Sequence, residues 1–472
     1  MNFGLTCKAG ILALSLALFC ASPAPAQNET GMAEEGGVTT NASGRLEMDM
    51  GQAVAYALGQ NQTLESAREQ AMAAESGRKS SRGAFGPALS TSYGFEHTNP
   101  APRYMGFEQD DSLYTWTVSV NQSIFTGFRL LAQYQKAALQ RDYYNSAQFS
   151  TELNLISDVQ QNFLTLLQAR ENVRSAQDSL TRLQDQLRVT TAFYDVGLRP
   201  RLDVLQAQVD AADAENVLLQ AQNALAVQEA RMNTLLNLPV EAPITYVGSL
   251  DYLPFDATLE QCLTTAYRLR PDVRMASKTV EMAQQDKRIA ASNFYPQITG
   301  YFNTQSTGDT PKAAGSEYIR TDYHQWNIGV VADWSLFEWG QTFYAVQQAR
   351  HLVSSARADE SALHEEVAYE IKSYLLNISE ARKRIKVAQY GLTQAREAYR
   401  VALARYEAQV GTNTDLLDAQ AKLSMAEASL TQAQADYLIA LSVLYAAMGI
   451  PNPNLDAALA PQGTSNWEAA LN

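Results

Sequence analysis

The chain has 472 residues, of which 46% are hydrophobic and 9% aromatic, and its formal net charge is −14 at pH 7. That length is enough for two or three ordinary domains, and the apolar fraction is too high for a chain that is disordered throughout. The acidic balance disfavours a nucleic-acid partner, because affinity for nucleic acid depends on neutralising phosphates with Lys and Arg.

Residues 1–26 are expected to be a signal peptide that is removed on export. Lys8 provides the positive charge, residues 11–20 form the apolar run, and Ala24-Pro25-Ala26 matches a small-residue cleavage site. Cys20 raises the alternative of a lipoprotein, but the Leu and Phe before it are not the small residues that lipidation sites need.

The mature chain is expected to be exported without a helical anchor. Cleavage would leave Cys262 as the one remaining cysteine of three, predicted to be a buried thiol without a disulfide. No later segment approaches about 20 continuous apolar residues, so the sequence predicts no transmembrane helix. The protein would then be periplasmic, secreted, or a β-protein of the outer membrane.

An internal repeat sets the domain organisation. Three matches share an offset of 212 residues and a fourth has an offset of 209: residues 203–208 with 415–420, Phe125 with Phe337, Pro239 with Pro451, and Phe85-Gly86-Pro87 with Phe294-Tyr295-Pro296. The three-residue difference between the two offsets is expected if one loop differs in length between the two halves. After a polar leader at 27–45, we expect these parts: a first repeat at 46–239, a linker at 240–257, a second repeat at 258–451 and an irregular tail at 452–472.

Each half is predicted to contain a helix, two strands and then two long helices. Residues 128–196 and 341–410 contain no Pro and a single Gly, Gly391, and the first span alone allows roughly 100 Å of helix. The returning helices, 202–238 and 412–448, lack both Gly and Pro. Such lengths favour coiled-coil packing.

The returning helices carry two adjacent stripes of small and apolar residues at heptad spacing. In the second of them one stripe starts at Leu416 and Ala419, and its neighbour starts at Leu417 and Ala421. A two-stranded coiled coil needs one stripe, whereas a helix that contacts neighbours on two sides needs two. The pattern therefore predicts a closed ring of helices.

Four short segments alternate polar and apolar residues: 88–96, 113–123, 297–304 and 326–333. Alternation alone also suits half-buried strands of a soluble sheet. Their length of about 9–11 residues suits tilted membrane strands, and aromatic residues such as Tyr114, Trp326 and Trp334 lie near their ends, as in membrane interfaces. The polar loops at 97–112 and 305–321 suit an exterior face.

Four strands cannot close a barrel, and an open sheet edge cannot face lipid. The membrane interpretation therefore requires several copies of the chain to share one barrel. Three copies of four strands would give twelve, an even number as in bacterial outer-membrane barrels.

Taken in order, these features resemble the TolC family of outer-membrane efflux and secretion channel proteins. The resemblance covers essentially the whole mature chain. It is carried by the doubled halves, by the turns Ile124-Phe125-Thr126-Gly127 and Leu336-Phe337-Glu338-Trp339-Gly340, and by Tyr194-Asp195-Val196-Gly197-Leu198 followed by residues 203–208.

The resemblance implies a mostly α fold with membrane β, in which long coiled-coil helices form a periplasmic α-barrel. A homotrimer would build a twelve-stranded β-barrel in the lipid of the outer membrane of a Gram-negative bacterium. The implied function is a passive exit duct of a tripartite efflux or type I secretion system. Its implied partners are a periplasmic adaptor protein and an inner-membrane transporter.

The resemblance also places the turns after Val196 and Val410 at the periplasmic tip. The residues expected to contact the adaptor there are Gly197, Leu198, Gly411 and Thr412. The two glycines would allow each turn to adopt positive φ. Asn413 stands where the resemblance leads us to expect an arginine that helps to lock the closed tip, and Tyr406 and Arg405 are candidate substitutes.

The predicted aperture or gating residues are Asp415, Asp418, Tyr406, Tyr194 and Asp203. Asp415 and Asp418 share one helix face, so three copies would present six carboxylates that attract cations and raise some of their own pKa values. Asp415 also suits helix capping, which is the main interpretation for Asp203. We expect the tip to open by separation of the helix pairs that carry Tyr194 and Tyr406.

Nothing in the sequence predicts catalysis, a cofactor or a metal site. The four histidines, at positions 97, 324, 351 and 364, lack metal-ligand spacing, and His364-Glu365-Glu366 lacks the second histidine of a zinc-hydrolase helix. Phosphate-binding loops and G-x-S-x-G motifs are absent. The alternative to a duct is a periplasmic coiled-coil adaptor or a structural scaffold, which would also have long helical hairpins.

Overall fold

The computed structural model describes residues 39–40, 46–98, 103–104, 107–108, 112–313 and 323–452. The expected signal peptide, most of the leader and most of the tail lie outside these residues, as do parts of the loops at 97–112 and 305–321. None of the helices in the described ranges combines the length and the apolar character needed to cross a membrane.

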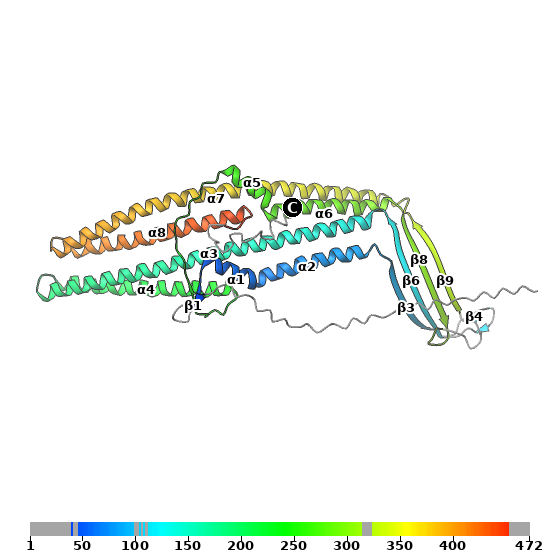
Figure 1. Cartoon of the computed structure of the whole chain (residues 1–472), viewed down its shortest axis with the longest axis horizontal. Helices are drawn as coiled ribbons and strands as arrows, with labels where there is room; N and C mark the ends of the chain where they lie inside the picture. The colour runs from blue at the N-terminus through cyan, green and yellow to red at the C-terminus, as the bar shows by residue number, and fades with distance from the viewer. Residues whose placement is uncertain are drawn as a thin grey trace, which may run out of the picture. The chain divides into compact units, whose positions relative to one another are not determined.

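The described residues form two successive sets of four α-helices (Figure 1). The first set is α1 (Met50–Gln60), α2 (Gln62–Gly83), α3 (Arg129–Asp195) and α4 (Arg201–Leu235). The second set is α5 (Leu259–Leu269), α6 (Pro271–Ala291), α7 (Gln341–Glu407) and α8 (Asn413–Ala447), with a short 3₁₀ turn, η1 (Ser292–Phe294), after α6.

The first helix of each half, predicted as one helix, is broken into two. Asn61 ends α1 and caps α2, since its Oδ1 accepts hydrogen bonds from the backbone N–H groups of Thr63 and Leu64. Pro271 opens α6, and a proline disfavours helical backbone at the residue before it, Arg270. The prediction missed both breaks because capping and pre-proline geometry act at single residues.

The two break residues each hold the end of a returning helix. Asn61 Nδ2 donates to the carbonyl of Leu235 at 3.3 Å, and Arg270 Nη1 donates to the carbonyl of Ala447 at 3.3 Å. Leu235 and Ala447 are the last residues of α4 and α8. These side chains therefore satisfy carbonyls that have no partner within their own helix.

The long helices follow the sequence prediction to within three residues at every end. Both α3 and α7 have 67 residues, and both α4 and α8 have 35. Because the spans lack Pro and contain one Gly, the backbone hydrogen-bond ladder is not interrupted. α3 packs along α4, α7 packs along α8, and α3 also contacts α8. The turns of both hairpins lie at the same end, away from the strands (Figure 1).

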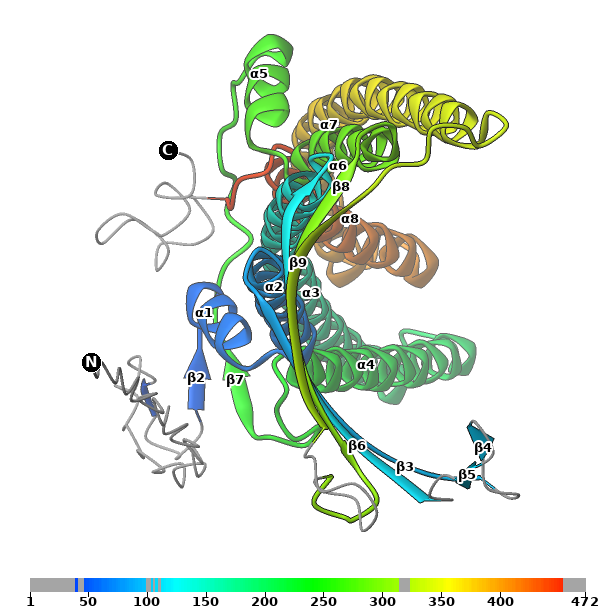
Figure 2. The same ribbon diagram turned by 90° about the vertical axis from the view of Figure 1, so that its right-hand side faces the viewer.

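Four strands form one curved antiparallel sheet in the order β3-β6-β8-β9 (Figure 2). Their bounds are Ala88–His97, Ser112–Thr126, Gln297–Gly308 and Tyr323–Asp333. All four were predicted, although β6, β8 and β9 run further than expected. A small pair, β4 (Arg103–Tyr104) and β5 (Phe107–Glu108), lies in the first hairpin loop. Within the described residues, β3 and β9 are the edges of the large sheet.

The linker between the halves takes part in the core. Its strand β7 (Ile244–Tyr246) pairs in parallel with β2 (Leu46–Met48), which also pairs with β1 (Thr39–Thr40). Tyr246 is buried against Phe163 of α3 and donates a hydrogen bond to Asn233. Cys262 is buried in the same cluster, as predicted, and burial raises the pKa of its thiol.

Candidate functional site

The two turns between the long helices are the predicted tip. In the first turn Gly197 has a φ of 79°, as expected. In the second turn the positive φ falls on Gln409, at 63°, and the expectation for Gly411 was wrong. A left-handed residue closes a helix directly after its C-cap. The C-caps are Val196 and Ala408, so Gly411 comes too late to play this part.

The two returning helices begin with different caps. Thr412 Oγ1 accepts from the backbone N–H of Asp415 at 3.1 Å, and the N–H of Thr412 donates to Asp415 Oδ2 at 3.2 Å. This reciprocal capping box confirms the cap expected at Asp415. At α4 the N-cap is Pro200, without a side-chain cap, and Asp203 does not cap. The carboxylate of Asp203 instead lies 3.8 Å from Arg199 Nη1.

Hydrogen bonds from Thr412 hold the pKa of Asp415 below its usual value. In the single chain this direction is opposite to the rise predicted for a ring of carboxylates. Asp418, one turn further along α8, is exposed and forms an ion pair with Lys422 at 2.7 Å. The two predicted aperture carboxylates therefore have different local partners.

The second turn rests on the first hairpin through Tyr406. This side chain is 1% exposed, and its hydroxyl lies 2.7 Å from Thr190 Oγ1 of α3. The ring of Phe193 lies 6.2 Å away, and the guanidinium of Arg199 lies 4.9 Å from the centre of the Tyr406 ring. Aromatic, cationic and hydroxyl groups of the first hairpin thus enclose one side chain of the second.

Arg199 joins the two turns, and the sequence analysis missed it. Its Nη2 donates to the carbonyl of Gly411 at 2.9 Å, and its Nη1 lies 3.8 Å from the carboxylate of Asp203. Arg199 of the first turn therefore places a cation at the second turn, and the candidate substitute Arg405 adds a positive charge that also lowers the pKa of Asp415. The contact joins positions 212 residues apart, so no local pattern marks it. Only a consideration of every arginine in both turns would have found Arg199.

A second buried contact lies deeper between the hairpins. Gln186 Nε2 donates to Asn413 Oδ1 at 2.6 Å, and both side chains are buried. Asn413 Nδ2 is buried without a hydrogen-bond partner among the described residues. An unsatisfied donor costs about 1–3 kcal/mol, so this contact holds the hairpins together less strongly than a fully satisfied one.

The structure thus gathers some of the residues predicted for gating or adaptor contact and leaves others apart. Tyr406, Asp203 and Gly411 meet through Arg199, whereas Tyr194 is 42% exposed and Asp418 faces its own helix neighbour. Apolar side chains are exposed at both turns, namely Val196, Leu198 and Val410.

A groove of about 320 Å³ lies between α3, α4 and α8, above the turns. Asp210 and Asp213 of α4 line it. Burial raises the pKa of Asp210, and the charge of Asp213 adds to that rise. One carboxylate oxygen of Asp210 is buried without a hydrogen-bond partner among the described residues.

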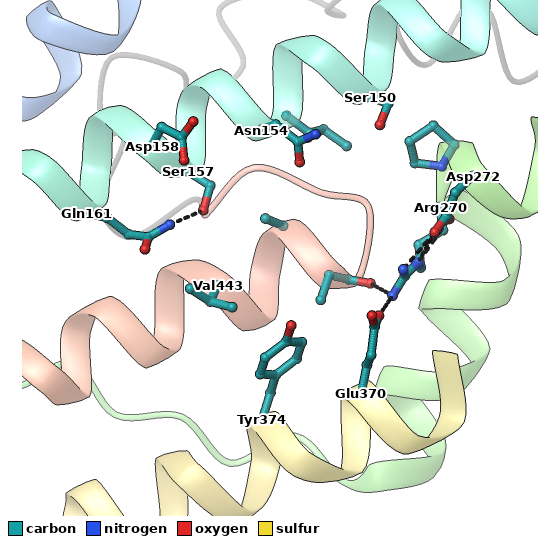
Figure 3. Close-up of a pocket in the computed structure, with 14 residues that line it drawn as sticks. Ser150, Asn154, Ser157, Asp158, Gln161, Arg270, Asp272, Glu370, Tyr374 and Val443 are labelled. Atoms are coloured by element: carbon teal, nitrogen blue, oxygen red, sulfur yellow. Dashed lines mark hydrogen bonds and ion pairs between the residues drawn. The ribbon is translucent and has the colours of Figure 1, made fainter. Parts of the chain in front are cut away.

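A polar cavity of about 440 Å³ lies where α8 ends against α6 and α7 (Figure 3). Arg270 binds Asp272 at 2.6 Å and Glu370 at 2.7 Å on one side of it. Burial would raise the pKa of Asp272, but its hydrogen bonds with Arg270 hold that pKa below the usual value. Because the carboxylates of Asp272 and Glu370 both form ion pairs with Arg270, we interpret this junction of α6, α7 and α8 as structural.

A sequence model of the family described as outer membrane efflux protein matches the chain twice, over residues 53–238 and 263–450. The chain belongs to the outer membrane efflux protein family. It is 25% identical over 354 residues to the outer membrane protein TolC of Vibrio cholerae, covering 72% of this chain and 76% of that protein. It is 22% identical over 320 residues to the alkaline protease secretion protein AprF of Pseudomonas aeruginosa, covering 66% and 64% respectively.

Solved structures of channels share the fold of this outer membrane efflux protein. The outer membrane protein VceC from Vibrio cholerae superposes with a TM-score of 0.73 at 18% identity, over 85% of this chain and 96% of that one. Family members are channels rather than enzymes. This outer membrane efflux protein is an exit duct of the outer membrane for efflux or type I secretion, and it extends into the periplasm. The finding favours the duct over an adaptor or scaffold.

Proposed function

We propose that three copies of the chain assemble into one passive duct that carries cargo from the periplasm to the exterior. The match of the family to both halves of the chain carries this proposal. The four-stranded sheet supports it, because a sheet with two open edges cannot face lipid. Three such sheets joined edge to edge form a twelve-stranded barrel.

Exposed apolar side chains support the same assembly. On the strands, Leu89, Phe95, Ile328 and Val330 are exposed, which suits contact with outer-membrane lipid. On the helices, α4 exposes Leu205, Val209 and Val217 and α7 exposes Leu352, Leu376 and Val387. In a ring these faces of α4 and α7 are covered by neighbouring copies, which closes a periplasmic α-barrel.

The turns form the gated end of this duct. The contact of Tyr406 with Thr190 and Arg199 holds the second hairpin against the first, which keeps the tip closed. Asp415 and Asp418, repeated in three copies, line the aperture with six carboxylates that attract cations. Opening separates the hairpins and breaks the contact at Tyr406.

The tip is also the surface that meets a periplasmic adaptor. Exposed Val196, Leu198 and Val410 give it an apolar surface, and exposed apolar groups of this kind mark protein interaction sites. Gly197, Leu198, Gly411 and Thr412 are the proposed adaptor contacts. An inner-membrane transporter supplies the energy, and the duct itself performs no reaction and needs no cofactor.

The proposed domain boundaries are those expected from the sequence. Residues 1–26 direct export and are removed, and residues 46–239 and 258–451 form the two repeats. The linker at 240–257 joins them, flanked by the leader at 27–45 and the tail at 452–472.

Fractionation and conductance test the proposal. We expect the protein in the outer-membrane fraction after alkaline extraction, with the mass of three chains in detergent and measurable conductance in planar bilayers. Divalent cations should block that conductance, and the block should weaken in an Asp415→Ala, Asp418→Ala double variant. A soluble periplasmic monomer would contradict the duct, and unchanged block would contradict the aperture residues alone.

A further inference from the structure

The helix ends next to the sheet are basic, although the chain as a whole is acidic. The last twelve residues of α2 and α6 and the first twelve of α3 and α7 contain eight Lys or Arg residues and three Asp or Glu residues. The last twelve residues of α3 and α7 and the first twelve of α4 and α8, next to the two turns, contain six basic and eight acidic residues. Positive charge is therefore concentrated where the helices meet the strands (Figure 1).

Three exposed arginines in these helix ends have no carboxylate partner among the described residues: Arg82, Arg288 and Arg350. The three carboxylates of the same helix ends form ion pairs with other cations: Glu75 with Arg78 and Lys79, Glu281 with Lys278, and Asp286 with Lys136. Glu338, just before α7, accepts a hydrogen bond from Thr342. The charge of the three arginines is therefore available to a partner outside the chain.

Arg129 shows which side of the helices continues the apolar face of the sheet. Ile328 pairs with Phe302 on that face, and Gln297, five residues before Phe302, points to the opposite face because successive side chains alternate. Arg129 Nη2 donates to Gln297 Oε1 at 3.0 Å. Leu131 comes two residues after Arg129, about 200° around the helix. Leu131 therefore lies on the side of the apolar face.

Arg288 of α6 lies on this same side. Its Nη1 donates to Gln135 Oε1 of α3 at 3.2 Å. Gln135 comes one turn after Leu131, so the two share a helix face, and Leu131 is exposed. Because α3 runs away from the sheet, the apolar side chain is nearer to the strands and the cation lies about one turn beyond it.

The second half places Arg350 in the same way. The 212-residue offset makes Phe343 the equivalent of Leu131, and Phe343 is 60% exposed. Arg350 comes seven residues after Phe343 on α7, which is close to two full turns, so both lie on one face. An exposed apolar residue is again followed by a cation further from the sheet.

α2 continues the pattern through the 209-residue offset. Lys79 is the equivalent of Arg288, and its side chain is 69% exposed. Arg82 comes three residues later, on the same helix face and nearer to the sheet. α2, α6 and α7 therefore each present a basic side chain on the side that continues the apolar face of the sheet.

We propose that Arg82, Arg288 and Arg350 bind the phosphate groups of anionic phospholipids in the periplasmic leaflet of the outer membrane. The proposal rests on the proposed duct, which turns the apolar face of the sheet to lipid. Trp334 and Phe294 are exposed at the junction of helices and strands, and Trp334 Nε1 donates to the carbonyl of Phe294 at 3.2 Å. Tryptophan is enriched at membrane interfaces, so the arginines lie at the level of the headgroups.

The chemistry of arginine suits this ligand. A guanidinium offers several N–H donors in a planar fork that matches phosphate, and its apolar stem allows the charge to reach along the protein surface toward the headgroups. Clusters of Lys and Arg beside a membrane attract anionic lipids. A zwitterionic headgroup carries its own cation and gains less from the band. Three arginines in each copy therefore favour phosphatidylglycerol over phosphatidylcholine around the duct.

Quenching of tryptophan fluorescence by brominated lipids tests the proposal. Trp334 is the reporter, in a chain whose other four tryptophans are replaced by Phe. The vesicles contain equal amounts of phosphatidylglycerol and phosphatidylcholine, with one of the two lipids brominated at a time. We expect an apparent preference of about fivefold for phosphatidylglycerol, and its loss in an Arg82→Gln, Arg288→Gln, Arg350→Gln variant. Added inorganic phosphate should leave the preference unchanged, because it lacks the acyl chains that hold a lipid beside the protein.

The matched control removes three exposed cations of α7 far from the sheet: Lys372→Gln, Lys383→Gln and Arg396→Gln. This variant should keep the parent preference. Equal quenching by the two lipids in the parent chain, in a protein that has the mass of three chains in detergent, would overturn the proposal and leave the duct intact. A preference that survives in the arginine variant, or that inorganic phosphate abolishes, would overturn it as well. Absence of quenching by either lipid would instead contradict the proposed function.

Discussion

The two helical hairpins have the same length and the same turn backbone, yet their turns carry different side chains. Where the first turn has Arg199 and Pro200, the second has Gly411 and Thr412. Tyr406 is buried against the first hairpin, whereas Tyr194, 212 residues earlier, is exposed. The same backbone therefore supports two roles. The first turn provides the donor, Arg199, and the second turn provides the acceptor, the carbonyl of Gly411.

At the turns the contact between the hairpins is small and polar, which suits a device that must open. A hydrogen bond contributes about 0.5–1.5 kcal/mol net, and a cation–π contact contributes about 0.5–2 kcal/mol. The contacts of Tyr406 and Arg199 therefore sum to a few kcal/mol in each chain. The interactions of an adaptor with the exposed tip can offset a difference of that size.

Removal of Arg199 should have the largest effect on the closed state. Arg199→Ala loses the hydrogen bond to Gly411 and the contact with the Tyr406 ring, together about 2 kcal/mol. That shifts the balance between closed and open tips by about 30-fold for each chain. Single-channel conductance in planar bilayers should rise. Arg199→Lys, which keeps the charge but loses the planar fork, should give an intermediate value.

Removal of the side-chain hydroxyl should change channel opening at Tyr406 but not at Tyr194. Tyr406→Phe leaves Thr190 without its buried partner, which costs about 1–2 kcal/mol, and we expect more frequent opening events. Tyr194→Phe changes an exposed residue and should leave the conductance record as in the parent protein. Equal effects of the two substitutions would mean that the hairpins are not distinguished in the way the structure indicates.

Substitutions at the two turn residues with positive φ should change the free energy of unfolding in opposite directions. Gly197→Ala places a Cβ where φ is 79° and should lower the free energy of unfolding by about 1 kcal/mol. Gln409→Gly relieves the same strain in the second turn and should raise it by a few tenths to about 1 kcal/mol. Thermal unfolding followed by circular dichroism measures both. A stabilising Gly197→Ala would contradict the assigned turn geometry.

The smallest effect should come from Asp210, which stands where the second hairpin has Lys422. Because the fold raises the pKa of Asp210, its ionisation opposes folding once the pH exceeds the unfolded value of about 3.9. Asp210→Asn should therefore raise the melting temperature at pH 7, and the gain should vanish below about pH 4. Glu215→Gln, at an exposed position of the same helix, should change neither.

The long helices and the strands could be predicted because their signals extend over many residues. Long spans without Pro and with a single Gly located α3 and α7 to within three residues, and alternation located all four strands. The helix breaks at Asn61 and Arg270 were missed, because each depends on the capping or pre-proline geometry of a single residue.

The candidate site was harder to predict because it depends on contacts between distant residues. Tyr406 was named from the sequence, but its partners Thr190 and Arg199 lie about two hundred residues earlier and belong to no local pattern. The expectation for Gly411 failed because a glycine was taken as the mark of positive φ, while the helix end itself places that φ on Gln409.

A reversible lock between the hairpins tests most directly whether their separation opens the duct. Gln186 and Asn413 are in hydrogen-bond contact across the two hairpins. Cysteine side chains are shorter than these two, so a Gln186→Cys, Asn413→Cys pair in an Arg199→Ala background is joined by a short bis-methanethiosulfonate cross-linker, whose disulfides can be reduced in the same bilayer. We expect low conductance in the cross-linked state and a return to the high Arg199→Ala level after reduction. High conductance that persists with the cross-link formed would contradict the account.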